Sequence, residues 1–64
     1  MSEGQVVIAV DAMGGENSPY KVLKGAEIFQ KIEKNTKIIF FGNEKLIKQI
    51  IKKNNINIFN YEIK

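Results

Sequence analysis

Apolar and polar positions follow two different periods along this chain, and the changes of period divide it into five segments. Residues 5–10 and 37–41, QVVIAV and KIIFF, are nearly continuous apolar runs rich in β-branched side chains. Such runs are typical of strands that are covered on both faces in a parallel sheet. The first run is therefore predicted to be a central strand. Residues 56–61 alternate instead, which indicates an edge strand or a partly covered one.

The two segments between these strands have the three- and four-residue spacing of amphipathic helices. In residues 19–33 the stripe predicted to face the sheet comprises Val22, Gly25, Ala26, Phe29 and Ile32. In residues 44–53 the corresponding apolar stripe comprises Leu46, Ile47, Ile50 and Ile51. Asn43 is placed to cap the second helix, and the pair Asn54 and Asn55 is placed to end it.

The resulting order β-α-β-α-β predicts an α/β fold, namely half of a Rossmann-like parallel sheet. If both crossovers have the same hand, both helices cover one face of the sheet. The other face of the two apolar strands then stays bare, and the first strand keeps a free edge. We therefore expect residues 1–64 to form the N-terminal portion of a single α/β domain, incomplete by itself.

Composition narrows the classes of site that the chain can carry. Its 64 residues contain no cysteine and no histidine, so disulfides, thiolate sites and histidine metal sites are excluded, and we expect no metal site. The net charge is +3, but the lysines are scattered without interleaved aromatic residues, so a nucleic-acid partner is not expected. No apolar stretch approaches the ~20 residues that span a bilayer, and the expected location is cytoplasmic.

The candidate chemistry lies in residues 11–18, DAMGGENS, between the first strand and the first helix. Ligands of open parallel sheets gather beyond the carboxyl ends of strands, where this loop is expected. Adjacent glycines allow positive φ and a close approach to the backbone, and Ser18 is placed to cap a helix whose first residue is Pro19. Backbone N–H groups in such a loop can bind an anion. The candidate site residues are Asp11, Gly14, Gly15, Asn17 and Ser18.

The same residues also fit a purely structural loop. In that interpretation the glycines only make the turn, Asn17 and Ser18 only cap the helix, and Asp11 only accepts backbone N–H groups. The chain contains neither the G-x-G-x-x-G nor the G-x-x-x-x-G-K-[ST] fingerprint. A nucleotide or sugar-phosphate binder, a small interaction module and an inactive remnant therefore stay open as alternatives to an enzyme.

The loop and its flanking elements also carry a family resemblance. The run Ala9-Val10-Asp11-Ala12-Met13-Gly14-Gly15, followed by an acidic residue and Pro19, resembles the N-terminus of the bacterial phosphate acyltransferase family, PlsX. Gly25-Ala26 and Phe41-Gly42-Asn43 are similar to that family too. Glu16 departs from it, because aspartate is expected there. Members are several times longer, and their Rossmann-like fold is related to that of isopropylmalate dehydrogenases.

The resemblance implies an activity, partners and a role for the loop. Family members form acyl phosphate from acyl-acyl carrier protein and inorganic phosphate for phospholipid synthesis. The implied partners are acyl carrier protein, phosphate and a second subunit of a homodimer, with at most peripheral membrane contact and no cofactor. Asp11, Gly14, Gly15, Asn17 and Ser18 would line the phosphate or acyl-phosphate cleft, while the catalytic residues stay unassigned. The 64 residues alone are expected to be inactive.

Overall fold

The computed structural model describes residues 4–64, which form a three-stranded parallel sheet and two helices. The elements in chain order are β1 (Val6–Asp11), α1 (Tyr20–Ile32), β2 (Thr36–Phe41), α2 (Glu44–Lys53) and β3 (Tyr61–Ile63). The strand order in the sheet is β1-β2-β3, with both pairs parallel. The predicted α/β class and the β-α-β-α-β order are confirmed.

The register of the sheet brings the loops after β1 and β2 to the same edge. β1 and β2 pair along their whole lengths, from Val6 opposite Thr36 to Asp11 opposite Phe41. The Ala12 N–H continues the ladder by donating to the Phe41 carbonyl at 3.0 Å. Parallel strands that end together place their carboxyl-terminal loops side by side, which is where open α/β sheets bind ligands.

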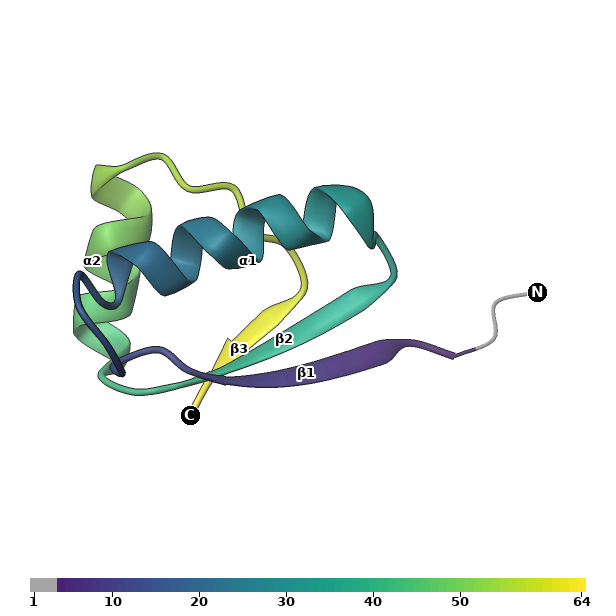
Figure 1. Cartoon of the computed structure of the whole chain (residues 1–64), viewed down its shortest axis with the longest axis horizontal. Coiled ribbons are helices and arrows are strands. Elements are labelled where there is room, and N and C mark those ends of the chain that lie inside the picture. Colours follow the sequence, from purple (N-terminus) through teal and green to yellow (C-terminus); the bar gives the residue numbers. More distant parts are fainter. Residues whose placement is uncertain (1–3) are drawn as a thin grey trace.

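The core lies on one side of the sheet, between the sheet and the helices (Figure 1). Ile38 and Phe40 of β2 point into it and are 2% and 0% exposed. Leu23 of α1 and Ile47 of α2 meet them there and are fully buried. The remaining buried apolar side chains of this core are Ala12, Ala26, Ile56 and Ile58. Since both helices contribute to one cluster, they cover the same face, as predicted.

The opposite face of the sheet carries no helix among residues 4–64 (Figure 1). Side chains there include Val7 and Phe41, which are 56% and 46% exposed. The expected bare face is therefore present. The prediction that β1 is a central strand is wrong for this part of the chain, because β2 occupies the middle and β1 has a neighbour on one side only.

The last strand begins later than predicted. The alternating pattern predicts it over residues 56–61, but β3 spans Tyr61–Ile63. Ile56 and Ile58 are buried, as their alternation indicates. The backbone of residues 56–59 does not form a ladder with β2, because the N–H groups of Asn57 and Phe59 donate instead to side chains of α1. Tertiary hydrogen bonds thus replace a sheet ladder over these residues.

Helix α1 is rotated about its axis relative to the prediction. Its buried residues are Leu23, Ala26, Glu27 and Gln30, whereas the predicted core residues Phe29 and Ile32 are 39% and 79% exposed. The rotation turns two polar side chains toward the connection between α2 and β3, where they find backbone partners. Helix α2 is oriented as predicted, with Ile47 buried, and the Asn43 side chain caps it by accepting from the Leu46 N–H at 3.0 Å.

Candidate functional site

The loop between β1 and α1 is folded around the Asp11 carboxylate. Asp11 Oδ1 accepts a hydrogen bond from the Met13 N–H at 3.0 Å. Gly14 lies against the same carboxylate, since a Cβ added there would be 3.2 Å from Asp11 Oδ2. That separation is tight enough to displace the carboxylate. Glycine at position 14 is therefore explained by close approach and not by its φ angle.

The second half of the loop contains the backbone conformations that set its shape. Gly15 and Asn17 have φ angles of +86° and +63°. These values lie in the left-handed region, which glycine and asparagine tolerate best. The predicted need for a positive φ thus applies to Gly15.

Ser18 has a different role from the predicted helix cap. Its hydroxyl donates to the Gly14 carbonyl and closes the loop on itself. Pro19 occupies the N-cap position of α1, and no side chain caps that end. The carbonyls of Asn17 and Pro19 instead accept from the Lys21 and Leu23 N–H groups, each at 2.9 Å. Because proline at the cap brings no side-chain acceptor, backbone carbonyls begin the helix.

Met13 joins this loop to the one that follows β2. A Cβ added to Gly42 would lie 2.6 Å from Met13 Cγ, so the thioether side chain rests directly on the glycine. A larger residue at position 42 would push Met13 away. The contact packs the two loops against each other at the carboxyl edge of the sheet.

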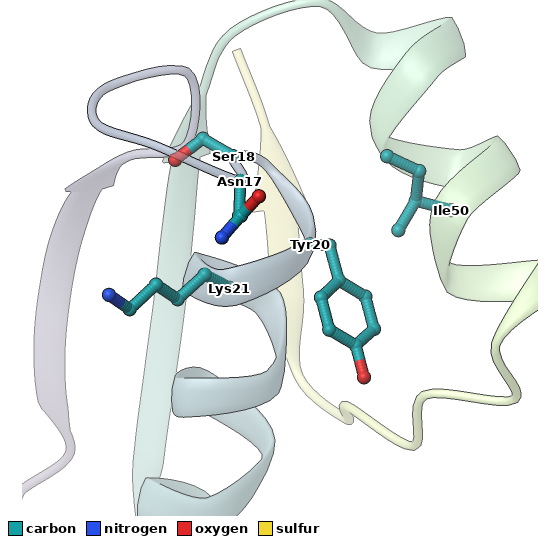
Figure 2. Close-up of a pocket in the computed structure, with 5 residues that line it drawn as sticks. All are labelled: Asn17, Ser18, Tyr20, Lys21 and Ile50. Atoms are coloured by element: carbon teal, nitrogen blue, oxygen red, sulfur yellow. The ribbon is translucent and has the colours of Figure 1, made fainter.

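An open pocket of about 460 Å³ adjoins the loop. It is lined by Asn17, Ser18, Tyr20, Lys21 and Ile50 (Figure 2). The Tyr20 ring lies on the side of α1 that faces Ile50 of α2, whereas the Lys21 side chain extends away from both (Figure 2). The pocket thus offers polar groups beside the loop and an apolar surface between the two helices.

The structure brings the five predicted site residues into one loop but gives them different positions. Asn17 and Ser18 line the pocket, whereas Asp11 is hydrogen bonded inside the loop. Sequence reasoning missed the Tyr20 and Ile50 surface. Tyr20 immediately follows Pro19, so its place in the first helical turn was a usable signal. Ile50 reaches the pocket only through the packing of α2 beside α1.

The loop also carries negative charge. Asp11 and Glu16 are the carboxylates of the loop, and both residues are exposed. Within residues 4–64 no three acidic, histidine or cysteine side chains come together as metal ligands. Over the same range, neither helix has the length and apolar character needed to cross a membrane.

Sequence comparisons connect most of this chain to enzymes of one name. A phosphate acyltransferase of Caldicellulosiruptor bescii is 36% identical over 42 residues, which are 66% of this chain and 13% of that protein. The phosphate acyltransferase of Pelagibacter ubique is 44% identical over 46 residues, 72% of this chain and 14% of its own length. That of Onion yellows phytoplasma is 35% identical over 48 residues, 75% of this chain and 13% of its own length.

These matches cover most of this chain but little of each relative. No family model and no solved structure matches the sequence. Several relatives nevertheless share one name, and each match covers about two thirds of this chain or more. The chain spans only 13–14% of the relatives it matches. The chain therefore belongs to the phosphate acyltransferase family, as a segment much shorter than the relatives it matches.

Proposed function

We propose that this chain forms one side of the phosphate and acyl-phosphate cleft of a phosphate acyltransferase. The observation that carries the proposal is the loop of residues 11–18. It lies beyond the carboxyl end of β1, it is closed on its own backbone by Asp11 and Ser18, and the chain that carries it matches enzymes of that name over about two thirds of its length or more. The chain alone holds only this side of the cleft, so we expect it to be inactive in isolation.

The reaction transfers an acyl group from a thioester to phosphate. An oxygen of inorganic phosphate attacks the carbonyl carbon of acyl-acyl carrier protein and forms a C–O bond. The C–S bond breaks, the leaving thiolate of the carrier protein takes up the proton that the attacking hydrogen phosphate loses, and acyl phosphate is released for phospholipid synthesis. Since phosphate is itself the nucleophile, the protein has to orient an anion and stabilise the developing oxyanion.

Each part of the loop has a role in this proposal. Gly14 and Gly15 are exposed and carry no Cβ, so a phosphate oxygen can approach their backbone N–H groups. Asn17 and Ser18 place polar groups at the pocket beside it. Tyr20 and Ile50 supply an apolar surface against which an acyl chain can pack. Asp11 holds the loop in shape through the Met13 N–H.

Titration of the 64-residue chain with inorganic phosphate tests the binding role. We expect the amide resonances of Gly14 and Gly15 to shift with phosphate, and the exposed Gly25 of α1 to serve as the unchanged control. A Gly15→Val variant should lose the shift, because a β-branched residue is strained at a φ of +86°. Unchanged loop resonances at saturating phosphate would contradict the proposal. A response to nucleotides or sugar phosphates that exceeds the response to phosphate would favour that alternative.

Activity is tested in a chimera in which residues 1–64 replace the matching segment of the Pelagibacter ubique enzyme. We expect it to form acyl phosphate from acyl-acyl carrier protein and phosphate. An Asp11→Asn substitution keeps the size of the side chain and one carbonyl acceptor. If Asp11 has only a structural role, the substituted chimera should keep the activity of the unsubstituted chimera to within about tenfold, which corresponds to ~1.4 kcal/mol in the activation barrier. A folded chimera with no activity would mark the chain as an inactive remnant.

A further inference from the structure

The outer edge of β1 presents an ordered row of backbone groups. The Val6 N–H donates to the Asn35 carbonyl and the Ala12 N–H to the Phe41 carbonyl, both toward β2. In a parallel ladder the N–H and C=O of one residue point to the same side and alternate along the strand. The intervening residues Val7, Ala9 and Asp11 therefore direct their N–H and C=O groups outward, where β1 has no neighbouring strand among residues 4–64.

This edge lacks the features that protect exposed strands. Edge strands are commonly short, charged, bulged or interrupted by proline. β1 pairs with β2 without interruption over six residues, VVIAVD, and carries a single charge at its last position. Its composition is that of an interior strand. Val6 and Val7 are nevertheless 46% and 56% exposed, because nothing in the described part of the chain lies beyond them.

The uncovered face of the sheet adjoins the same edge. The register places Ala9 opposite Ile39 and Asp11 opposite Phe41, with their side chains on the side away from the helices. Phe41 is 46% exposed there. Farther from β1, the ion pair between Lys37 and Glu62 crosses the same face at 2.5 Å. The apolar surface is thus concentrated beside β1 and is bounded by charge on the β3 side.

We propose that the β1 edge and this face together form the docking surface for strand-helix units from the part of a phosphate acyltransferase outside the matched region. A strand enters parallel to β1, and the helix that follows it covers Val7, Ile39 and Phe41. The larger part of each relative lies outside the match, which supplies enough chain for such units. The inference rests on family membership and on the sheet, and not on the proposed chemistry.

The hand of parallel crossovers explains why one occupant suits both surfaces. Right-handed connections put α1 and α2 on one face while strands are added from β1 toward β3. Strands added in the opposite direction, beyond β1, place their helices on the other face by the same rule. A second copy of this chain leaves one surface unsatisfied, because pairing through β1 keeps the face bare and stacking through the face keeps the edge unpaired.

This docking also completes the candidate site. Ligands of doubly wound sheets bind where the direction of strand addition reverses, beyond the carboxyl ends of the two central strands. A parallel strand beside β1 brings its own carboxyl-terminal loop next to residues 11–18. The incoming unit then supplies the other side of the cleft, and β1 becomes an interior strand as its sequence predicts.

Amide exchange compares the 64-residue chain with the chimera that joins it to the remainder of the Pelagibacter ubique enzyme. In the chain alone at low concentration, Val7, Ala9 and Asp11 should exchange faster than Ile8 and Val10, whose N–H groups point toward β2. In the chimera the three outward amides should slow by at least about tenfold. Outward amides that remain fast in a folded chimera would overturn the proposal. Slow exchange in the chain alone, with sedimentation as a dimer, would do so too.

A pair of matched variants tests the face. Val7→Lys puts a charge on the proposed docking surface, and Ile32→Lys puts one on α1 at a side chain that is 79% exposed. In the chimera, amide exchange at Ala9 should be about tenfold or more faster in the Val7→Lys variant than in the Ile32→Lys variant. In the chain alone, the two variants should have the same exchange rate at Ala9. Equivalence in the chimera would overturn the proposal. If the outward amides of β1 are protected from exchange in a chimera that has no activity, the proposed docking surface is supported and only the proposed chemistry is contradicted.

Discussion

Gln30 joins helix α1 to the connection before β3, and replacing it tests how that connection is held. The side chain is fully buried. Its Nε2 donates to the Phe59 and Thr36 carbonyls at 2.6 Å and 3.2 Å, and its Oε1 accepts from the Phe59 N–H at 3.1 Å. One side-chain amide thus satisfies the backbone of Phe59 in the way a neighbouring strand would.

Gln30→Leu keeps the approximate volume of the side chain and removes all three hydrogen bonds. A net contribution of about 1 kcal/mol each, with a penalty of similar size for a buried group left unpaired, suggests a loss of roughly 2–4 kcal/mol. Phe59 is 44% exposed, so water can replace part of what is lost there. A chain of this size has a free energy of unfolding of only about 3–10 kcal/mol, so the expected loss is a large fraction of its total stability.

Urea unfolding followed by circular dichroism measures the loss, and Gln49→Leu is the matched control because Gln49 is exposed on α2. Amide exchange at Phe59 should accelerate in the Gln30 variant and not in the control. If Gln30→Leu costs no more than Gln49→Leu, or if Phe59 keeps its protection, then the burial of Ile56 and Ile58 holds the connection and the Gln30 hydrogen bonds do not.

Single contacts yield three further predictions. The pKa of the Glu27 carboxyl is lowered from 4.5, chiefly by the hydrogen bond from the Lys24 side chain and then by the one from the Asn57 N–H. The stabilisation that the Glu27 carboxylate contributes should therefore be complete above pH 4.5 and be lost as the pH falls below that value and through the lowered pKa. The stability difference between wild type and Glu27→Gln should therefore shrink on acidification, with Glu33→Gln as the control for the loss of one carboxylate; a constant difference would contradict the assignment. Gly42→Ala should destabilise the chain by about 1–3 kcal/mol, because the added Cβ would lie 2.6 Å from Met13 Cγ. In a double-mutant cycle Met13→Ala should relieve part of that cost; additive effects of the two substitutions would show that the Met13 contact is not its cause. Asn43→Ala should cost about 1 kcal/mol in urea unfolding through loss of the α2 cap, and a cost equal to that of Gln49→Ala would show that the cap contributes nothing.

The candidate site was only partly predictable. The sequence places Asp11, Gly14, Gly15, Asn17 and Ser18 in one loop, because a strand and a helix on either side leave no other location. It does not show that the Ser18 hydroxyl donates to the Gly14 carbonyl, since serine before a helix is ordinarily a cap. The contribution of Ile50 to the pocket depends on how α2 packs. Ile50 is 30 positions from Tyr20 along the chain, but both side chains line the same pocket.

The sequence alone determined the order of elements and the side of the sheet that is covered. Continuous apolar runs at β1 and β2, helical spacing between them and the Asn43 cap are local signals, and they were sufficient because short parallel strands joined by helices allow few arrangements. The uncovered face follows from that arrangement without any knowledge of side-chain contacts.

Only the tertiary structure decided the rotation of α1 and the start of β3. The apolar residues of α1 are distributed around most of the helix circumference, so periodicity alone could not decide which side of the helix faces the sheet. Glu27 and Gln30 determine the rotation of α1, because burying their polar side chains is favourable only where the backbone N–H groups of residues 57 and 59 supply hydrogen-bond partners. Those same bonds take the place of a strand ladder and delay β3 to Tyr61. A polar side chain that satisfies a distant backbone leaves no periodic signal in the sequence.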